Sequence, residues 1–115
     1  MTFKTWEIYR ANLDPIVGSE QGKSRPVLII SEGEINNLIN TVNVIPVTSL
    51  KDGRVIYPNE SKITTEQTGL TSESIALCHQ IRTLDKKRLT FKYGEIKSQQ
   101  NRNEILEALR FQLGL

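Results

Sequence analysis

The chain has 115 residues, of which 37% are hydrophobic and 24% are charged, values typical of one folded domain with a single modest core. No apolar run approaches the roughly 20 residues that a helix needs to cross a bilayer, and the N-terminus lacks the apolar stretch of a signal peptide, so we expect a cytoplasmic protein with no membrane partner. The net charge of +2 permits nucleic-acid binding but does not indicate it, because nucleic-acid-binding domains usually carry a stronger basic excess.

The first half of the chain predicts three strands, one long loop and one short helix. Trp6 and Ile8 alternate with polar residues in the first strand, and Asp14-Pro15 ends it. Four consecutive aliphatic residues at 27–30 predict a strand buried on both faces, which tolerates Pro26 only near its start. The predicted elements are a strand at 5–13, a loop at 14–24, a strand at 25–31, a short helix at 32–40 and a strand at 41–49.

The second half predicts shorter strands followed by a terminal helix. Asp85 is a suitable cap for a helical turn, Ser98 is a suitable N-cap for the helix, and Gly114 suits the position just after it. The apolar residues expected to share one face of this helix are Ile105, Leu106, Leu109 and Leu113. The other predicted elements are a short strand at 55–57, a loop at 59–69, a strand at 74–81, a helical turn at 84–89 and a strand at 91–96.

Short strands with one terminal helix predict a β-rich α+β fold. We interpret it as a small, strongly bent barrel of the SH3-like type with short helices and a C-terminal helix. The sequence contains no repeat, low-complexity tract or long linker, so we expect residues 1–115 to form a single domain.

One cysteine and one histidine limit the available chemistry. Cys78 has no second cysteine for a disulfide or a zinc site, so we expect it to be a small, partly buried apolar residue. His79 alone excludes mechanisms that need two histidines, and no Asp or Glu cluster has the spacing of a known metal site. If the protein is an enzyme, we therefore expect it to work without a metal or another cofactor.

Three segments place polar side chains beside apolar strands. In the loop at 18–24, Glu20 offers a carboxylate, and Arg25 follows at the start of a rigid strand, where its planar guanidinium could pair with two phosphate oxygens or form a surface salt bridge. Thr48 ends a buried strand, where its hydroxyl could contact a phosphate or simply be an ordinary strand side chain. His79 could act as an acid or base or be structural, and Arg82 with Asp85 suggests a local ion pair.

Taken together, these segments resemble the MazF/PemK family of ribonuclease toxins. Three blocks in the same order carry the resemblance, which extends from about Trp6 to the terminal helix. The blocks are Gly18-Ser19-Glu20-Gln21-Gly22 with Arg25-Pro26-Val27-Leu28, then Val44-Ile45-Pro46-Val47-Thr48-Ser49, then Gln80-Ile81-Arg82-Thr83-Leu84-Asp85-Lys86.

The resemblance implies a homodimer of SH3-like barrels that cuts single-stranded RNA, mRNA above all, at short sequences and so inhibits translation and growth. It also implies a small acidic antitoxin protein whose flexible tail occupies the RNA groove. The family's catalytic arginine and threonine fall on Arg25 and Thr48. The position before the glutamine, often acidic in relatives, is His79 here, and this departure could change the pH dependence or the RNA preference.

A metal-independent mechanism is consistent with these residues, because RNA carries its own nucleophile in the 2′-hydroxyl. Arg25 would stabilise the doubly charged phosphorane and Thr48 would add a contact. Glu20 and His79 are the two candidates for the general base, and the products would be a 2′,3′-cyclic phosphate and a 5′-hydroxyl. The candidate RNA-binding residues are Ser19, Gln21, Ser49 and Gln80.

Two other functions stay open at this point. The first is a catalytically silent relative that binds RNA or regulates, which the histidine at position 79 allows. The second is a toxin that binds a protein, as gyrase-poisoning relatives do on the same scaffold, because fold alone does not separate these activities. The pair of Arg25 and Thr48 favours cleavage, since a gyrase poison needs no arginine that stabilises a phosphate.

Overall fold

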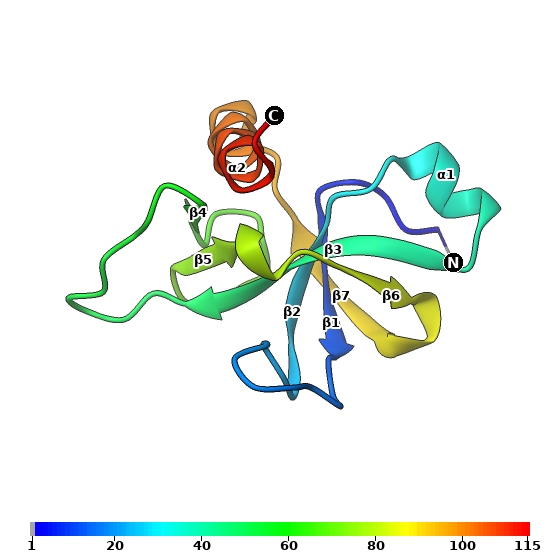
Figure 1. The fold of residues 1–115 in the computed structure, drawn as a ribbon. Coiled ribbons are helices and arrows are strands. Elements are labelled where there is room, and N and C mark those ends of the chain that lie inside the picture. Colours follow the sequence, from blue (N-terminus) through cyan, green and yellow to red (C-terminus); the bar gives the residue numbers. More distant parts are fainter. Residues whose placement is uncertain (1) are drawn as a thin grey trace.

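The computed structural model describes residues 2–115 and shows a strongly bent antiparallel sheet with a helix packed on one side (Figure 1). The strand order is β4-β5-β3-β2-β1-β7, and β6 pairs with β3. The strands are β1 (Glu7–Asn12), β2 (Ser24–Ile29), β3 (Thr41–Ser49), β4 (Glu60–Ile63), β5 (Ser74–Leu77), β6 (Arg82–Asp85) and β7 (Leu89–Glu95). The helices are α1 (Gly33–Leu38), α2 (Gln99–Leu113) and the 3₁₀ helices η1 (Cys78–Gln80) and η2 (Lys86–Arg88).

The predicted α+β fold with short strands and a C-terminal helix is confirmed. Within residues 2–115, the strand order runs from β4 to β7 with no pairing between these two ends, so the bent sheet is barrel-like but open. None of the helices in this described part of the chain is both long and apolar enough to cross a membrane.

The apolar runs of β1, β2 and β3 supply two cores, because consecutive residues of a strand point to opposite faces of the sheet. Tyr9, Val27 and Val44 belong to one buried cluster. Their neighbours Ile8 and Leu28 belong to the other, together with Ile105 of α2. The prediction that the strand around Val27 is buried on both faces is therefore confirmed.

The terminal helix is capped as predicted. The Ser98 hydroxyl accepts a hydrogen bond from the backbone N–H of Asn101 at 3.1 Å, and Gly114 adopts left-handed backbone at the other end. The predicted apolar face is only partly correct. Ile105 is fully buried, but Leu113 is 48% exposed.

Three predictions about local structure are wrong. Residues 55–57 form no strand; they lie in a loop between β3 and β4 that begins with the turn-forming sequence Lys51-Asp52-Gly53. The predicted loop at 59–69 contains β4, in which Glu60, Ser61 and Ile63 are buried; this strand contacts α2, and no local pattern reveals that contact. The predicted strand at 74–81 ends at Leu77 and continues as η1.

Candidate active site

The candidate site lies where β2 and β3 separate. These strands pair from Ile29 with Val44 to Val27 with Pro46, and no further pair follows. Beyond that point the N-terminal part of β2 pairs only with β1, whereas the end of β3 pairs with β5. Pro26 and Pro46 lie at the point of separation, and neither has a backbone N–H to extend the ladder.

A pocket of about 530 Å³ occupies this separation, and both Arg25 and Thr48 line it. The structure thus brings together Arg25, Thr48 and Ser49, three of the residues that the sequence singled out. Residues 70–72, from the loop before β5, form another wall, and Tyr93 of β7 lies at the margin.

The lining of this pocket is cationic. Its charged residues are Lys23, Arg25 and Lys51, and none of its described lining residues is an aspartate or a glutamate. Within residues 2–115 these three cations form no salt bridge, whereas Lys62 and Lys92 are paired with carboxylates at 2.7 Å and 2.6 Å. Hydroxyl groups surround the cations, so the pocket offers charge and hydrogen-bond donors to an anion.

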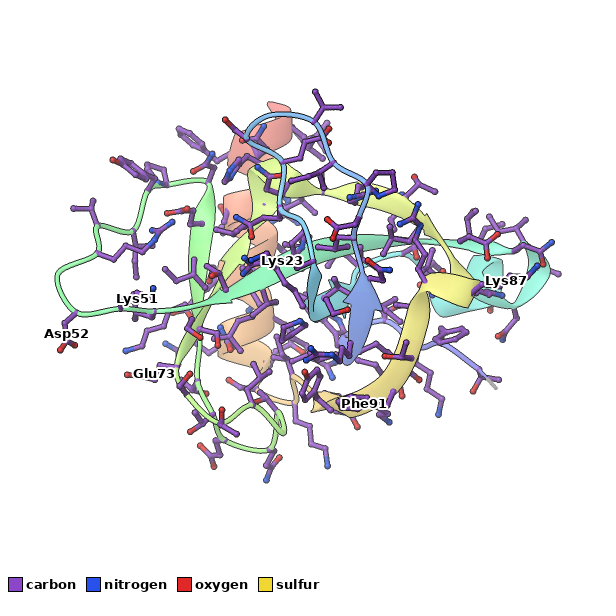
Figure 2. The ribbon with its side chains drawn as sticks, turned by 90° about the horizontal axis from the view of Figure 1, so that it is seen from below. Lys23, Lys51, Asp52, Glu73, Lys87 and Phe91 are labelled. Atoms are coloured by element: carbon purple, nitrogen blue, oxygen red, sulfur yellow. The ribbon has the colours of Figure 1, made fainter. Side chains whose placement is uncertain are left out.

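Figure 2 views the molecule from the side on which Lys23 and Lys51 are exposed. Asp52, next to Lys51, points outward at the tip of its loop, and Glu73 is occupied by its salt bridge with Lys62. Neither of these two carboxylates lines the main pocket.

The guanidinium of Arg25 is held by its inner nitrogen. Nε donates a hydrogen bond to the carbonyl oxygen of Gly22 at 2.8 Å, and the two terminal nitrogens have no hydrogen-bond partner within the described chain. The loop that supplies Gly22 is closed at its base, because the N–H of Leu13 donates to the carbonyl of Lys23 at 2.9 Å. A fixed Nε with two free terminal nitrogens is suited to binding two oxygens of one anion.

Four of the other proposed site residues line a second pocket of about 420 Å³: Ser19, Glu20, His79 and Gln80. The carboxylate of Glu20 accepts a hydrogen bond from the N–H of Val17 at 2.7 Å. Glu20 also lines a smaller pocket of about 300 Å³ together with Arg25. His79 lines neither pocket that contains Arg25. Of the two candidate bases, Glu20 is thus the one that shares a pocket with the arginine.

Gln80 links η1 to the loop at 14–24. Its amide oxygen accepts a hydrogen bond from the N–H of Gln21 at 3.2 Å, and its amide nitrogen donates to the carbonyl of Ser19 at 3.3 Å. The side-chain oxygen of Gln21 is buried and has no hydrogen-bond partner in the described chain. Gln80 therefore positions the loop, and Gln21 and Arg25 line the same smaller pocket.

The expected ion pair between Arg82 and Asp85 is absent from the described residues. Arg82 donates to the backbone carbonyl of Leu13 at 3.1 Å, and the Asp85 carboxylate accepts from the N–H of Lys87 at 2.8 Å. Asp85 thereby caps η2, as the sequence predicted. Cys78 is fully buried, and burial raises the pKa of its thiol to about 11, consistent with the expected apolar role.

Sequence reasoning missed several residues of the main pocket: Lys23, Ser24, Lys51, Tyr93 and the segment 70–72. Lys51 follows directly after the strand end at Ser49, so its position offered a signal. Tyr93 offered none, because only the pairing of β7 with β1 brings it near a strand end that lies far away in sequence.

Comparisons with known proteins identify the family of the chain. Residues 4–113 match the model of the PemK-like, MazF-like toxin of type II toxin–antitoxin systems. The endoribonuclease EndoA of Bacillus subtilis (strain 168) is 34% identical over 115 residues, which cover all of this chain and 97% of the relative. MazF from Deinococcus radiodurans shares the fold with a TM-score of 0.83 and 25% identity, covering 100% of this chain and 99% of that one.

A mycobacterial endoribonuclease, solved in complex with its cognate antitoxin, gives a TM-score of 0.77 at 25% identity, covering 97% of this chain and 95% of that one. The family match spans nearly the whole chain and includes the strand ends that carry Arg25 and Thr48. This protein belongs to the PemK-like, MazF-like family of type II toxin–antitoxin toxins.

Proposed function

We propose that this protein is the toxin of a toxin–antitoxin pair and acts as an endoribonuclease that cuts single-stranded RNA, mRNA above all, at specific sequences. The observation that carries the proposal is the pocket that holds Arg25 and Thr48 among unpaired cations and no carboxylate. The similarity to EndoA, an endoribonuclease, supports the same activity. Cleavage of mRNA would inhibit translation and growth.

Cleavage would proceed through the 2′-hydroxyl of the RNA and would require no metal. The 2′-oxygen forms a bond to phosphorus, the bond from phosphorus to the 5′-oxygen breaks, and the products are a 2′,3′-cyclic phosphate and a 5′-hydroxyl. The two terminal nitrogens of Arg25 would bind oxygens of the phosphorane, and the Thr48 hydroxyl would donate to a third. Donors fixed in advance of the reaction each contribute about 10²–10³ in rate.

The proton of the 2′-hydroxyl needs an acceptor, and a proton must reach the leaving 5′-oxygen. We assign the role of proton acceptor to Glu20, because it shares a pocket with Arg25, and we keep His79 as the other candidate for this role. A positioned base contributes about 10²–10⁴ in rate. A pH–rate profile of Glu20→Gln and His79→Asn identifies the base, because only the loss of the true base removes the dependence of kcat on that group.

We propose four further RNA contacts in three pockets. Ser49 would bind the sugar–phosphate backbone in the main pocket, and Gln21, which lines the smaller pocket with Arg25, would contact a base edge. Ser19 and Gln80 line the second pocket and would bind an adjacent nucleotide. Hydroxyl and amide groups suit this role because they can both donate and accept hydrogen bonds.

We further propose that the protein forms a homodimer and is inhibited by a small acidic antitoxin with a flexible tail. Support for the antitoxin comes from the mycobacterial endoribonuclease that was solved with its cognate antitoxin. The cationic pocket would attract acidic side chains of such a tail as it attracts phosphates. An acidic tail bound there would exclude RNA directly.

The decisive test compares wild type, Arg25→Ala and a matched control, Arg110→Ala, on RNA in the presence of EDTA. Arg110 is an exposed arginine of α2 that does not line the main pocket. We expect Arg25→Ala to lose at least about 100-fold in rate while the control keeps full activity. A substrate with hydrogen in place of the target 2′-hydroxyl should resist cleavage, and mapping of the fragment ends should give a cyclic phosphate.

The same assay separates the alternative functions. A folded wild-type protein that binds RNA without cutting it would be a silent RNA-binding relative. A wild-type protein that neither binds nor cuts RNA would favour the protein-binding toxin. Robust cleavage of the deoxy substrate, or near wild-type activity of Arg25→Ala, would refute the proposed mechanism.

A further inference from the structure

Two aromatic side chains of β7 continue the main pocket along the surface. Tyr93 lines the pocket, and the ring of Phe91 lies beside the ring of Tyr93 with 4.8 Å between their centroids. Phe91 is 49% exposed and belongs to neither buried cluster. Figure 2 shows Phe91 projecting from the surface of β7. The packing of the core does not explain why this large ring is exposed beside a cationic pocket.

A β-bulge produces this arrangement. In the pairing of β7 with β1, Lys92 lies opposite Tyr9 and Gly94 lies opposite Ile8, which leaves Tyr93 as an extra residue between them. Bulges of this kind often redirect a side chain next to a functional site. Here the bulged Tyr93 stands beside Phe91 and at the margin of the pocket.

Arg10 of β1 adds a positive charge to the two rings. It lies opposite Phe91 in the ladder, and its Nη1 donates a hydrogen bond to the hydroxyl of Tyr93 at 3.0 Å. Arg10 has no salt bridge within residues 2–115, whereas neighbouring Lys92 is paired with Glu7 at 2.6 Å. Of the two cations Arg10 and Lys92, Arg10 is therefore the one that is available to bind an external anion.

We propose that Phe91, Tyr93 and Arg10 form an extended binding site for the single-stranded RNA that leaves the main pocket. Bases stack on the two rings, and Arg10 binds a phosphate of the same segment. Aromatic rings next to unpaired cations are the usual composition of surfaces that bind single strands, because stacking tolerates any base and the cations hold the backbone. The proposal rests on the ribonuclease function proposed above and extends its substrate contacts beyond the cleaved linkage.

The test measures binding of oligonucleotides in which the 2′-hydroxyl at a mapped cleavage site is replaced by hydrogen. A dinucleotide fills only the main pocket, whereas a decanucleotide also reaches the rings. We expect Phe91→Ala to bind the decanucleotide at least about fivefold more weakly and the dinucleotide as tightly as wild type. Phe91→Leu should share the loss, because it keeps apolar volume without a ring, and Phe91→Trp should restore affinity.

The control is Leu38→Ala, which removes an apolar side chain that is 78% exposed on α1. This helix precedes β3 and lies at the far end of the molecule from the pocket (Figure 1). Steady-state cleavage of the long RNA should show a higher KM for Phe91→Ala with unchanged kcat, because the reacting atoms do not contact the ring.

Two outcomes would overturn the inference, and they differ in what else they imply. If wild type cleaves RNA and Phe91→Ala matches it in affinity and KM, the extended site is refuted and the ribonuclease function stands. If wild type neither binds nor cleaves RNA, both proposals fail together.

Discussion

Replacing Lys51 by Gln should weaken RNA binding in a way that depends on salt. Lys51 is one of the three cations that line the main pocket, and none of the three is neutralised by a described carboxylate. A cation that contacts a phosphate displaces a condensed counterion, so its contribution to affinity falls as the salt concentration rises. Gln keeps most of the length of the side chain and removes only the charge.

The expected magnitude follows from the number of cations. For single strands, the slope of log K against log salt is about −0.7 for each phosphate contact, so three contacts give about −2. Raising the salt from about 50 to about 200 mM would then weaken wild-type binding roughly 20-fold and Lys51→Gln binding about sevenfold, with a slope near −1.4. The assay is fluorescence anisotropy with a tetranucleotide, whose three phosphates can meet the three cations and whose cleavage-site 2′-hydroxyl is removed.

Lys87→Gln is the matched control for charge. Lys87 is an exposed lysine of η2 that lies at the opposite end of the molecule from Lys51 in Figure 2. Its loss changes the net charge equally but should leave the slope as in wild type. An unchanged slope in Lys51→Gln, or an equal change in both variants, would show that no phosphate binds near Lys51 and would contradict the proposed pocket.

Three further predictions concern stability and reactivity. Arg54→Met removes two hydrogen bonds of 2.9 and 2.8 Å from the buried carboxylate of Glu60, so at pH 7 urea unfolding should show a loss of about 2 kcal/mol. Because Arg54 lowers the pKa of Glu60 from 4.5, this loss should vanish as the pH falls below that range; an equal loss in acid would contradict the ion pair. Gly69→Ala should cost about 1–3 kcal/mol of unfolding free energy and raise the KM for RNA, because Gly69 has a φ of +78° and an added Cβ would overlap the carbonyl of Tyr93; wild-type values would refute this packing. Cys78 should resist iodoacetamide at pH 8 until the protein is unfolded, since burial raises its thiol pKa to about 11, and rapid labelling of the native protein would contradict that burial.

Local patterns predict this fold well where the structure of an element depends only on its own residues. Residues 41–49 form β3 with the predicted bounds, because alternating valines at 42 and 44 and buried residues beyond them require extended backbone on a two-faced sheet. The N-cap at Ser98 is equally local, since it depends on one hydroxyl and one N–H three residues away. Such features need no knowledge of the rest of the chain.

The errors arise where a contact with a residue distant in the sequence determines the local structure. Val55 and Ile56 have strand-forming side chains, but they lie in a loop that the ion pair of Arg54 with Glu60 closes. Arg82 has a carboxylate three residues later, at Asp85, yet it donates to the carbonyl of Leu13, which lies 69 residues away. Periodicity and residue spacing carry no information about such partners.

The position of the candidate site follows from the way the sheet divides. β3 is long enough to pair with β2 through Pro46 and with β5 from Val47 onward, so its last residues have β5 on one side and no strand on the other. Arg25 lies in the part of β2 that no longer pairs with β3, and the side chains of Arg25 and Thr48 both line the cavity between the two strands. A chain with a net charge of only +2 can thereby hold three unpaired cations in one place, because several of its carboxylates are paired with other lysines and arginines. The local concentration of charge, and not the total, is what equips this surface for a polyanion.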